Sequence, residues 1–520
     1  MDGDHLLAID GGTGSCRAVL FDLQGRQVAV SQREWSHPAL PGYPGSQVFE
    51  TGRNWELISR CVREVIATSG IAAERIAAVS STSMREGIVL YDRAGREIWA
   101  CPNADSRAAE EATELIERGL ADEIYATSGD WIAITSAPRL LWLRRHEPEI
   151  FERAAHLTML GDWILYRLSG RYVTDPSLGS SSGLFNLAER QWSGRLLDIC
   201  GLPAAVCPEV VEPGTVVGSV TAQAAEETGL APGTPVVVGG ADTQLGLVGI
   251  GVDVPGRCTV VGGSFWQQTV VLDRPLIDPG GRLRTLCHTI PGQWMMEGIG
   301  FFSGLAMRWL RDAFCQYEKE QAAARGLDAY VLMEEEAAKA PPGANGVVGI
   351  FSNVMNAKRW VHAAPAFMQF DLTNPEGSGR KECIRALQES AAYVSRSHVE
   401  IIRSLTGLPV EEIVFTGGGA KGTLWPQIMA DVLNVRVRVP AVKESTALGA
   451  AIYAGLGAGL YRDLAGMLPG MVRIERTYEP DAATHELYQG LFERWQRVYE
   501  RSLGLVGDGL LRPLWQAAGT

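Results

Sequence analysis

One pattern occurs twice in this chain: an apolar strand, a turn of two glycines and a hydroxyl residue, and a second strand. The first copy covers residues 6–22, and its turn begins Gly11-Gly12-Thr13. The second copy covers residues 258–273, and its turn reads Gly262-Gly263-Ser264. Apolar runs on both sides of a tight glycine turn predict a β-hairpin. We therefore expect two halves, each opened by the same hairpin.

The length of the chain supports this division. Its 520 residues exceed what one hydrophobic core usually supports. The segment 250–257 is rich in Gly and Pro, which is typical of a domain boundary. We predict domains at 1–252 and 253–520. Apolar residues at helical spacing predict a terminal helix at about 484–503, whose aromatic stripe we interpret as core.

The remaining pattern mixes helices and strands. Buried strands are predicted at 76–81, 235–240 and 413–415, and helices at 55–68, 104–119, 303–325 and 424–433. This order indicates an α/β fold. The longest uncharged run, 445–461, is about one residue too short for a transmembrane helix and is built from Ala and Gly, so we expect a buried helix.

Composition excludes several classes of partner. With 47 Lys plus Arg against 60 Asp plus Glu, the net charge is -13, and no basic stripe is present for nucleic acid or anionic lipid. The nine cysteines are scattered without a Cys-x-x-Cys pair, as in a reducing compartment. The first residues lack a secretory signal pattern. We expect a cytoplasmic protein without a nucleic-acid or membrane partner.

The Gly turns are candidates for phosphate binding. A Gly-x-x-x-x-Gly-Lys-Ser/Thr loop is missing from the sequence, which argues against a P-loop enzyme. In the first hairpin, glycines allow backbone N–H groups to approach an anion, and Thr13 and Ser15 add donors. The preceding Asp10 could hold a hydrated magnesium ion. Such a turn alone is more often a plain hairpin, and the matching turn at 262–264 favours a clamp on one polyphosphate.

A third glycine cluster, 416–422, follows a buried strand and precedes a helix, where α/β sheets bind ligands. One interpretation is a flexible connection. Three consecutive glycines favour the other, in which adenine and ribose lie against the backbone. Lys421 would face either phosphate or solvent.

Acid and base candidates stand at strand ends. Asp242 leaves an apolar strand beside Gly240 and Gln244, which suits a general base, although a helix cap is an equal alternative. Arg85 and Glu86 follow the strand 76–81 and could bind a small polar ligand; the alternative is a surface ion pair. The histidines show no zinc spacing.

Together these landmarks resemble the FGGY-type carbohydrate kinases, which include glycerol kinase and xylulokinase. The likeness runs from the first hairpin to the C-terminal helix. The stretches that carry it include 83–87, 263–268, 307–315, 362–365, 444–451 and 485–489. The resemblance implies an α/β fold of two ribonuclease-H-like domains, as in actin, sugar kinases and chaperone ATPases, with an interdomain cleft.

The resemblance also implies ATP and Mg²⁺ and assigns roles to residues. Asp242 would be the catalytic base, and Asp10 and Asp242 would form the metal site. The substrate would be bound by Arg85, Glu86, Asn103, Asp242 and Gln244. The ATP contacts would be Thr13, Gly14, Ser15, Arg17, Gly263, Ser264, Gly304, Gly418, Gly419 and Lys421.

The part of the family most similar to this chain implies phosphorylation of the terminal hydroxyl of linear 4,5-dihydroxy-2,3-pentanedione, in quorum-sensing signal processing. It also suggests a regulatory phosphocarrier protein of sugar uptake as a partner. Asn103 stands where many relatives carry Trp, and 129–135 lacks the Tyr of glycerol kinases, so glycerol is a poor candidate. Arg139 replaces the usual Lys and Ser264 the usual Thr, and both keep donor chemistry.

Two alternatives remain. The first is a pentulose or polyol kinase of the same family, against which only the side chains around Arg85, Asn103 and Trp266 argue. A nonenzymatic, actin-like ATP-binding protein would not need Asp242. For a kinase we also expect domain closure about the segment near residue 250, because water must be excluded.

Overall fold

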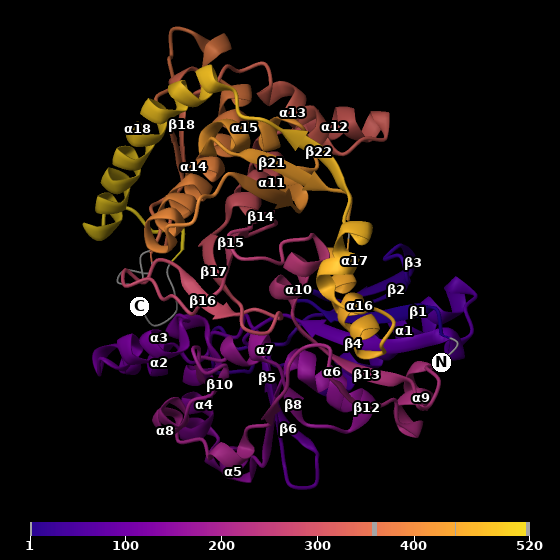
Figure 1. The fold of residues 1–520 in the computed structure, drawn as a ribbon. Helices are drawn as coiled ribbons and strands as arrows, with labels where there is room; N and C mark the ends of the chain where they lie inside the picture. Colours follow the sequence, from indigo (N-terminus) through magenta and orange to yellow (C-terminus); the bar gives the residue numbers. More distant parts are fainter. Residues whose placement is uncertain (1–2, 356–360, 443, 516–520) are drawn as a thin grey trace.

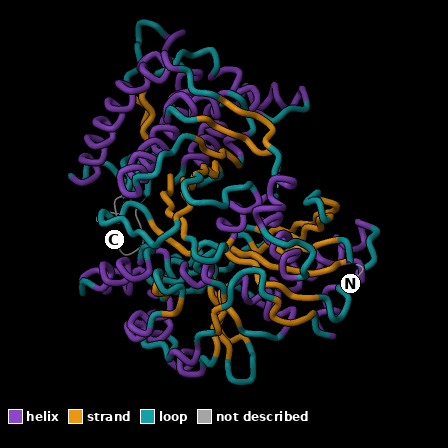
Figure 2. The backbone as a smooth tube through the Cα atoms, viewed as in Figure 1, coloured by secondary structure: helices purple, strands orange, loops and turns teal. Residues whose placement is uncertain are grey.

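The structure is a computed structural model that describes residues 3–355, 361–442 and 444–515. Two large β-sheets form its framework, one in each half of the chain (Figure 1). Strands run through the middle of each half and helices lie outside them (Figure 2). The first sheet has the order β12 (Val216–Ser219), β13 (Pro235–Ala241), β4 (Ile76–Ser83), β1 (His5–Gly11), β2 (Ser15–Asp22), β3 (Gln27–Glu34). The second has the order β16 (Arg284–Cys287), β17 (Trp294–Gly300), β15 (Trp266–Leu272), β14 (Cys258–Gly262), β20 (Glu412–Thr416), β21 (Arg436–Pro440), β22 (Ile474–Tyr478).

The two sheets share one topology. In the first, β3-β2-β1-β4-β13 places three antiparallel strands beside two parallel ones. In the second, β17-β15-β14-β20-β21 repeats this arrangement. The expected hairpins are confirmed, with Gly11 paired to Cys16 and Gly262 paired to Trp266. The division at 252/253 stays a prediction.

Smaller sheets and the helices complete the fold. The smaller sheets pair β6 (Glu97–Cys101), β5 (Ile88–Tyr91) and β7 (His156–Met159); β9 (Phe185–Asn186) and β10 (Gln191–Trp192); β8 (Val173–Thr174) and β11 (Glu209–Val210); β18 (Val348–Ile350) and β19 (Ala366–Met368). The helices before residue 250 are α1 (Thr51–Ser69), α2 (Ala109–Glu117), α3 (Leu120–Ser128), α4 (Ser136–His146), α5 (Pro148–Arg153), α6 (Leu160–Ser169), α7 (Pro176–Ser180), α8 (Gly194–Cys200), α9 (Ala222–Thr228) and α10 (Asp242–Gly249). Those after it are α11 (Ser303–Phe314), α12 (Gln316–Arg325), α13 (Ala329–Ala337), α14 (Arg380–Thr406), α15 (Leu424–Leu433), α16 (Ser445–Gly457), α17 (Leu464–Met471) and α18 (Ala482–Gly507). Across the described ranges, no helix combines the length and apolarity that crossing a bilayer requires.

Two predicted helices differ from the structure. The helix expected at 104–119 begins only at Ala109, because the buried Asp105 carboxylate accepts hydrogen bonds from the Gln47 backbone and the Arg107 side chain, which competes with helix formation. The helix expected at 303–325 is interrupted at Cys315, whose φ of -109° and ψ of 44° are not helical. Cys315 is fully buried, so packing of this residue wins over helix propensity.

Helix α16 crosses from the second half to the first. It packs on β1, β4 and β13 and beside α10, and Figure 1 shows it, in orange, beside these indigo and purple strands. Its contact with α10 requires glycine: a Cβ on Gly249 would lie 2.0 Å from the Ser445 carbonyl oxygen, and one on Gly449 would lie 2.1 Å from that of Leu245. The expected buried helix in 445–461 is therefore confirmed as α16, and it ties the halves together behind Asp242.

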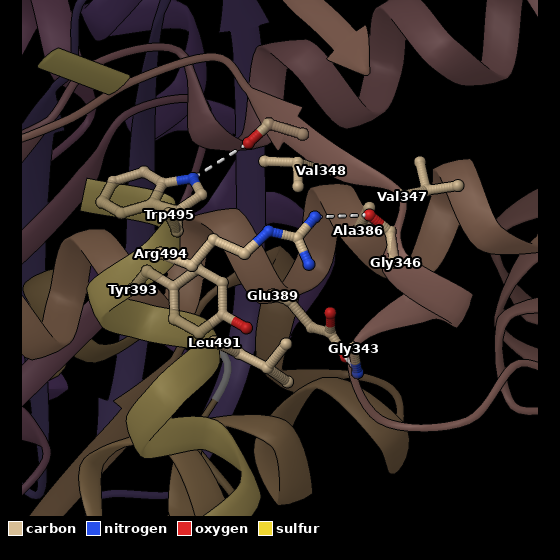
Figure 3. A pocket seen from close by; sticks show the side chains of 11 residues that line it. Gly343, Gly346, Val347, Val348, Ala386, Glu389, Tyr393, Leu491, Arg494 and Trp495 are labelled. Atoms are coloured by element: carbon tan, nitrogen blue, oxygen red, sulfur yellow. Dashed lines mark hydrogen bonds between the residues drawn. The ribbon is translucent and has the colours of Figure 1, made fainter. Parts of the chain in front are cut away.

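Helix α18 covers the range in which a terminal helix was expected. Its aromatic residues Tyr488, Phe492 and Trp495 are buried in the core of the second half, as interpreted from the sequence. The Trp495 indole donates to the Gly349 carbonyl, and Arg494 to that of Gly346 (Figure 3). The pocket at this contact has a volume of about 20 Å³, which is room for a single water, so no cofactor fits there.

Candidate active site

Three parallel strands of the first sheet deliver the main polar residues to one edge. Strands β1, β4 and β13 are neighbours, so their carboxyl ends meet, which is where α/β sheets bind ligands. Asp10 lies near the end of β1, Arg85 and Glu86 follow β4, and Asp242 follows β13 and begins α10. The Arg85 Nε lies 4.0 Å from the Asp242 carboxylate, whose side chain remains 34% exposed. The structure thus brings these predicted residues together.

Behind Arg85 and Glu86 lies a buried ion-pair network that sequence reasoning missed. Arg85 donates two hydrogen bonds to Glu297, at 3.1 and 3.2 Å. Arg284 donates to Glu297 at 2.9 Å, to Glu86 at 2.8 Å and to Asp130 at 3.3 Å. All five side chains are less than 10% exposed. The available signal was Arg284 at the start of β16 and Glu297 inside the otherwise apolar strand β17.

This network fixes the protonation of the cluster. Burial alone would raise the pKa of Glu297, but the Arg85 and Arg284 guanidiniums hold it below its ordinary value. Burial raises the pKa of Asp130 to about 6. Burial also raises the pKa of Asp242, an effect that Arg85 opposes and the Glu86 and Glu297 carboxylates increase. Asp242 therefore combines an accessible carboxylate with a raised pKa, which is what a general base requires.

The backbone of Glu86 is held in a strained conformation, with φ at 61°. Its N–H donates to the Ser181 hydroxyl at 3.1 Å, and its carbonyl accepts from Ser136 and Arg139, both at 2.7 Å. Arg139 also donates to the carbonyls of Asn103 and Asp105. Such over-determined strain is typical of functional sites, and Arg139 aligns the two segments that carry Glu86 and Asn103.

The first glycine turn is supported from one side. The Trp35 indole donates to the carbonyls of Gly12 at 3.0 Å and Thr13 at 3.3 Å, while Thr13 and Gly14 are exposed. The Asn103 amide donates to the Thr13 hydroxyl at 3.1 Å. A residue expected on the substrate side therefore contacts one expected on the phosphate side, so the two subsites adjoin.

Next to this turn, Arg17 is held between two carboxylates. Its Nε lies 3.3 Å from Asp10, and its Nη1 lies 2.7 Å from Glu444, which precedes α16. Burial raises the pKa of Asp10 to about 7; Arg17 opposes this, and the Asp242 and Glu444 carboxylates add to it. Asp10 and Asp242 thus feel each other's charge, and a cation between them would relieve the repulsion.

The second glycine turn lines a large cavity together with the predicted nucleotide residues Gly304, Gly418, Gly419 and Lys421. The predicted ATP contacts of the first hairpin, Thr13, Gly14, Ser15 and Arg17, do not line it. Gly304 donates its N–H to the Ser264 carbonyl at 3.2 Å, and a Cβ on Gly304 would lie 2.0 Å from the Gly263 carbonyl oxygen. Gly417, with φ at 86°, approaches Gly262 in the same way. The cavity measures about 690 Å³, a size that suits a nucleotide.

This cavity is also lined by Glu334, which was not predicted. Lys421 lines it with an exposed side chain. The Glu334 carboxylate accepts from the backbone N–H groups of Thr423 and Leu424 at the start of α15. In the sequence Glu334 belongs to a run of three glutamates, which is typical of a solvated surface. Among the predicted substrate residues, Gln244 lies elsewhere: its side chain is fully buried and donates to the Cys287 carbonyl at 3.1 Å.

Comparison with known proteins identifies the family. Residues 5–249 match the N-terminal domain model of the FGGY family of carbohydrate kinases, and residues 268–458 match its C-terminal domain model. The autoinducer-2 kinase of Escherichia coli (strain K12) is 48% identical over 518 residues, which cover 99% of this chain and 98% of that protein.

Solved structures of similar fold support the same architecture. The xylulose kinase of Lactobacillus acidophilus aligns with a TM-score of 0.86 and 20% identity over 97% of this chain and 99% of that one. The xylulose kinase of Rhodospirillum rubrum aligns with a TM-score of 0.84 and 26% identity, covering 96% and 98%. These likenesses confirm the expected two-domain α/β fold. The chain belongs to the FGGY family of carbohydrate kinases.

Proposed function

We propose that this protein transfers the terminal phosphoryl group of ATP to the terminal hydroxyl of autoinducer-2, in its linear form 4,5-dihydroxy-2,3-pentanedione. The products are ADP and phospho-autoinducer-2. The similarity to autoinducer-2 kinase over nearly the whole chain supports the substrate. The observation that carries the reaction type is the partly exposed Asp242 carboxylate, 4.0 Å from the Arg85 guanidinium at the end of β13.

Asp242 acts as the general base. It takes the proton of the acceptor hydroxyl as the hydroxyl oxygen bonds to the γ-phosphorus, and the bond to the β–γ bridging oxygen breaks. Arg85 and Glu86 bind the oxygens of the substrate, with Asn103 beside them. The network behind these side chains keeps them in one geometry, which is the main protein contribution to phosphoryl transfer.

The nucleotide lies between the two glycine turns. Gly263 and Ser264 of the second turn donate to phosphate oxygens, as do Thr13, Gly14 and Ser15 of the first. Gly304, Gly418 and Gly419 leave room for the nucleotide, and Lys421 faces the phosphates. When phosphate is bound, Arg17 either moves from Glu444 to the phosphate or contacts both groups.

A magnesium ion fits the carboxylates of Asp10 and Asp242. Within 3–355, 361–442 and 444–515, no cluster of three or more His, Cys, Asp or Glu residues forms a metal cage. Mg²⁺ needs none, because it is usually held by one or two carboxylates together with substrate phosphates. When bound it neutralises charge on the phosphate oxygens. The mutual repulsion of Asp10 and Asp242 is the observation that supports this site.

The test is a substrate panel. ATP consumption with Mg²⁺ is measured against dihydroxypentanedione, xylulose, ribulose and glycerol, and kcat/KM is compared. We expect dihydroxypentanedione to be preferred. Preference for a pentulose would keep the kinase and overturn the substrate.

A regulatory phosphocarrier protein of sugar uptake is a further proposed partner, supported by the family resemblance alone. Adding purified phosphocarrier protein to the kinase assay is expected to change the rate at fixed ATP. An unchanged rate at saturating phosphocarrier would remove this partner.

A further inference from the structure

The side chains that we assign to the substrate do not stand alone in their half of the molecule. Arg85 and Glu86 follow β4 of the first sheet, but their partners Arg284 and Glu297 come from β16 and β17 of the second sheet. Arg284 and Glu297 face each other directly in the strand register. The ion pairs therefore cross between the halves.

The geometry of these contacts restricts the movement of Arg85 and Glu86. Glu297 engages both terminal nitrogens of Arg85, at 3.2 and 3.1 Å, and such a bidentate pair fixes the guanidinium plane. Arg284 holds the Glu86 carboxylate at 2.8 Å. Asp130 adds a further contact to Arg284. Because both terminal nitrogens of Arg85 contact Glu297, the Nε of Arg85 is the atom that faces Asp242.

The same strands lead to the nucleotide pocket. Glu297 pairs with Thr269 on β15, three residues from Trp266, which closes the hairpin of the second glycine turn. Three residues span about 10 Å along a strand. Strand β15 therefore connects the turn of the nucleotide pocket at one end with β17, which carries the partner of Arg85.

We propose that Glu297 and Arg284 are positioning residues for the acceptor: they hold Arg85 and Glu86 in place, so the acceptor site is completed by both halves of the molecule. This inference deepens the proposed function and rests on its assignment of Arg85 and Glu86 to the substrate. A cluster of two guanidiniums and four carboxylates, including Asp242, also disfavours acceptors that carry a carboxylate, because like charges repel. Dihydroxypentanedione is uncharged and meets this condition.

The experiment is a double-mutant cycle on acceptor affinity. Glu297→Gln is prepared in the wild-type chain and in an Arg85→Ala chain, and KM for dihydroxypentanedione and the dissociation constant of ADP are measured. Glu297→Gln is expected to raise KM by about 10- to 100-fold and to leave ADP affinity within about twofold. In the Arg85→Ala chain the same change adds little, because its effect passes through Arg85.

Two further variants guard against misfolding. Arg284→Lys keeps the charge but cannot reach three carboxylates at once, and it should raise KM in the same way. Glu389→Gln breaks a matched buried pair with Arg385, at 2.9 Å in α14, and should leave KM unchanged. An undiminished effect of Glu297→Gln in the Arg85→Ala chain, or an equal loss of ADP affinity, would overturn the inference.

Failure of the proposed substrate is a separate result. If the wild-type protein prefers a pentulose, the cycle is run with that sugar, and it decides the positioning role by the same criterion.

Discussion

The two glycine turns share a topology and differ in chemistry. Asp10 precedes the first turn and Arg17 follows it, and both lie in a charged cluster with Glu444. Val261 precedes the second turn, which packs against the glycine backbones at 304 and 417. The repeated fold therefore sets where each turn lies, while neighbouring side chains decide its task. Charged side chains surround the first turn, whereas glycine backbones surround the second and leave space for the nucleotide.

The largest expected effect is on the chemical step, and it should leave nucleotide binding unchanged. Asp242→Asn removes the base, and kcat should fall by about 10²- to 10⁴-fold. ADP affinity should stay close to that of the wild type, since the cavity of 690 Å³ is lined by other residues. Single-turnover kinetics and calorimetric ADP titration measure both. An equal loss of ADP binding would mean that the two sides are not separable.

The next variant, Gly304→Ala, should affect nucleotide binding more than acceptor binding. Gly304→Ala places a Cβ 2.0 Å from the Gly263 carbonyl oxygen, so the second turn must move. KM for ATP should rise by about 10- to 100-fold, with a smaller change in KM for the acceptor. Gly490→Ala on α18, where nothing lies within 4 Å, is the matched control and should leave both constants unchanged.

Asp10→Asn tests the charge beside the first turn. The pKa of Asp10 is raised to about 7 by burial, so protons compete with magnesium below that pH. The wild-type protein should need less Mg²⁺ as pH rises from 6 to 8. The variant should need about tenfold more Mg²⁺, with little pH dependence from this group. A variant with an unchanged Mg²⁺ requirement would exclude Asp10 from the metal site.

The same variant makes a prediction about stability. A carboxyl with a raised pKa in the folded state favours folding while protonated, and this contribution is lost as pH rises from 3.8 through about 7. Asp10→Asn avoids that loss. The Tm of the variant minus that of the wild type should therefore increase by several degrees between pH 4 and 7 and stay constant above pH 7. A constant difference across this range would contradict the raised pKa.

The smallest expected effect lies where the two subsites meet. Asn103→Ala removes the hydrogen bond of 3.1 Å to Thr13, which is worth about 1 kcal/mol, or about fivefold in kcat/KM. Both substrates should be affected, because Asn103 links their subsites. A change in kcat/KM for the acceptor alone would contradict a functional link between the subsites through Thr13.

Much of the framework follows from sequence patterns. The repeated hairpins and the strand ends at Asp10, Arg85 and Asp242 could be predicted because apolar runs and glycine turns report local structure. The break at Cys315 could not, since it depends on packing.

The network of Asp130, Arg284 and Glu297 could not be predicted either, because the pairs of Arg284 with Asp130 and of Glu297 with Arg85 join residues more than 150 positions apart. Gln244 stands two residues after Asp242, and sequence proximity suggested a shared role. The helical turn at the start of α10 instead directs its side chain to the Cys287 carbonyl. Positions two apart on a helix do not face each other.

The most direct test of the central claim is phosphorus NMR of the reaction of dihydroxypentanedione with ATP and Mg²⁺, using the wild-type protein and Asp242→Asn. The account predicts a phosphomonoester on the terminal carbon, formed with stoichiometric ADP by the wild-type protein and nearly absent with the variant. ADP with free phosphate and no phosphomonoester, or an equal yield of ester from the variant, would contradict it.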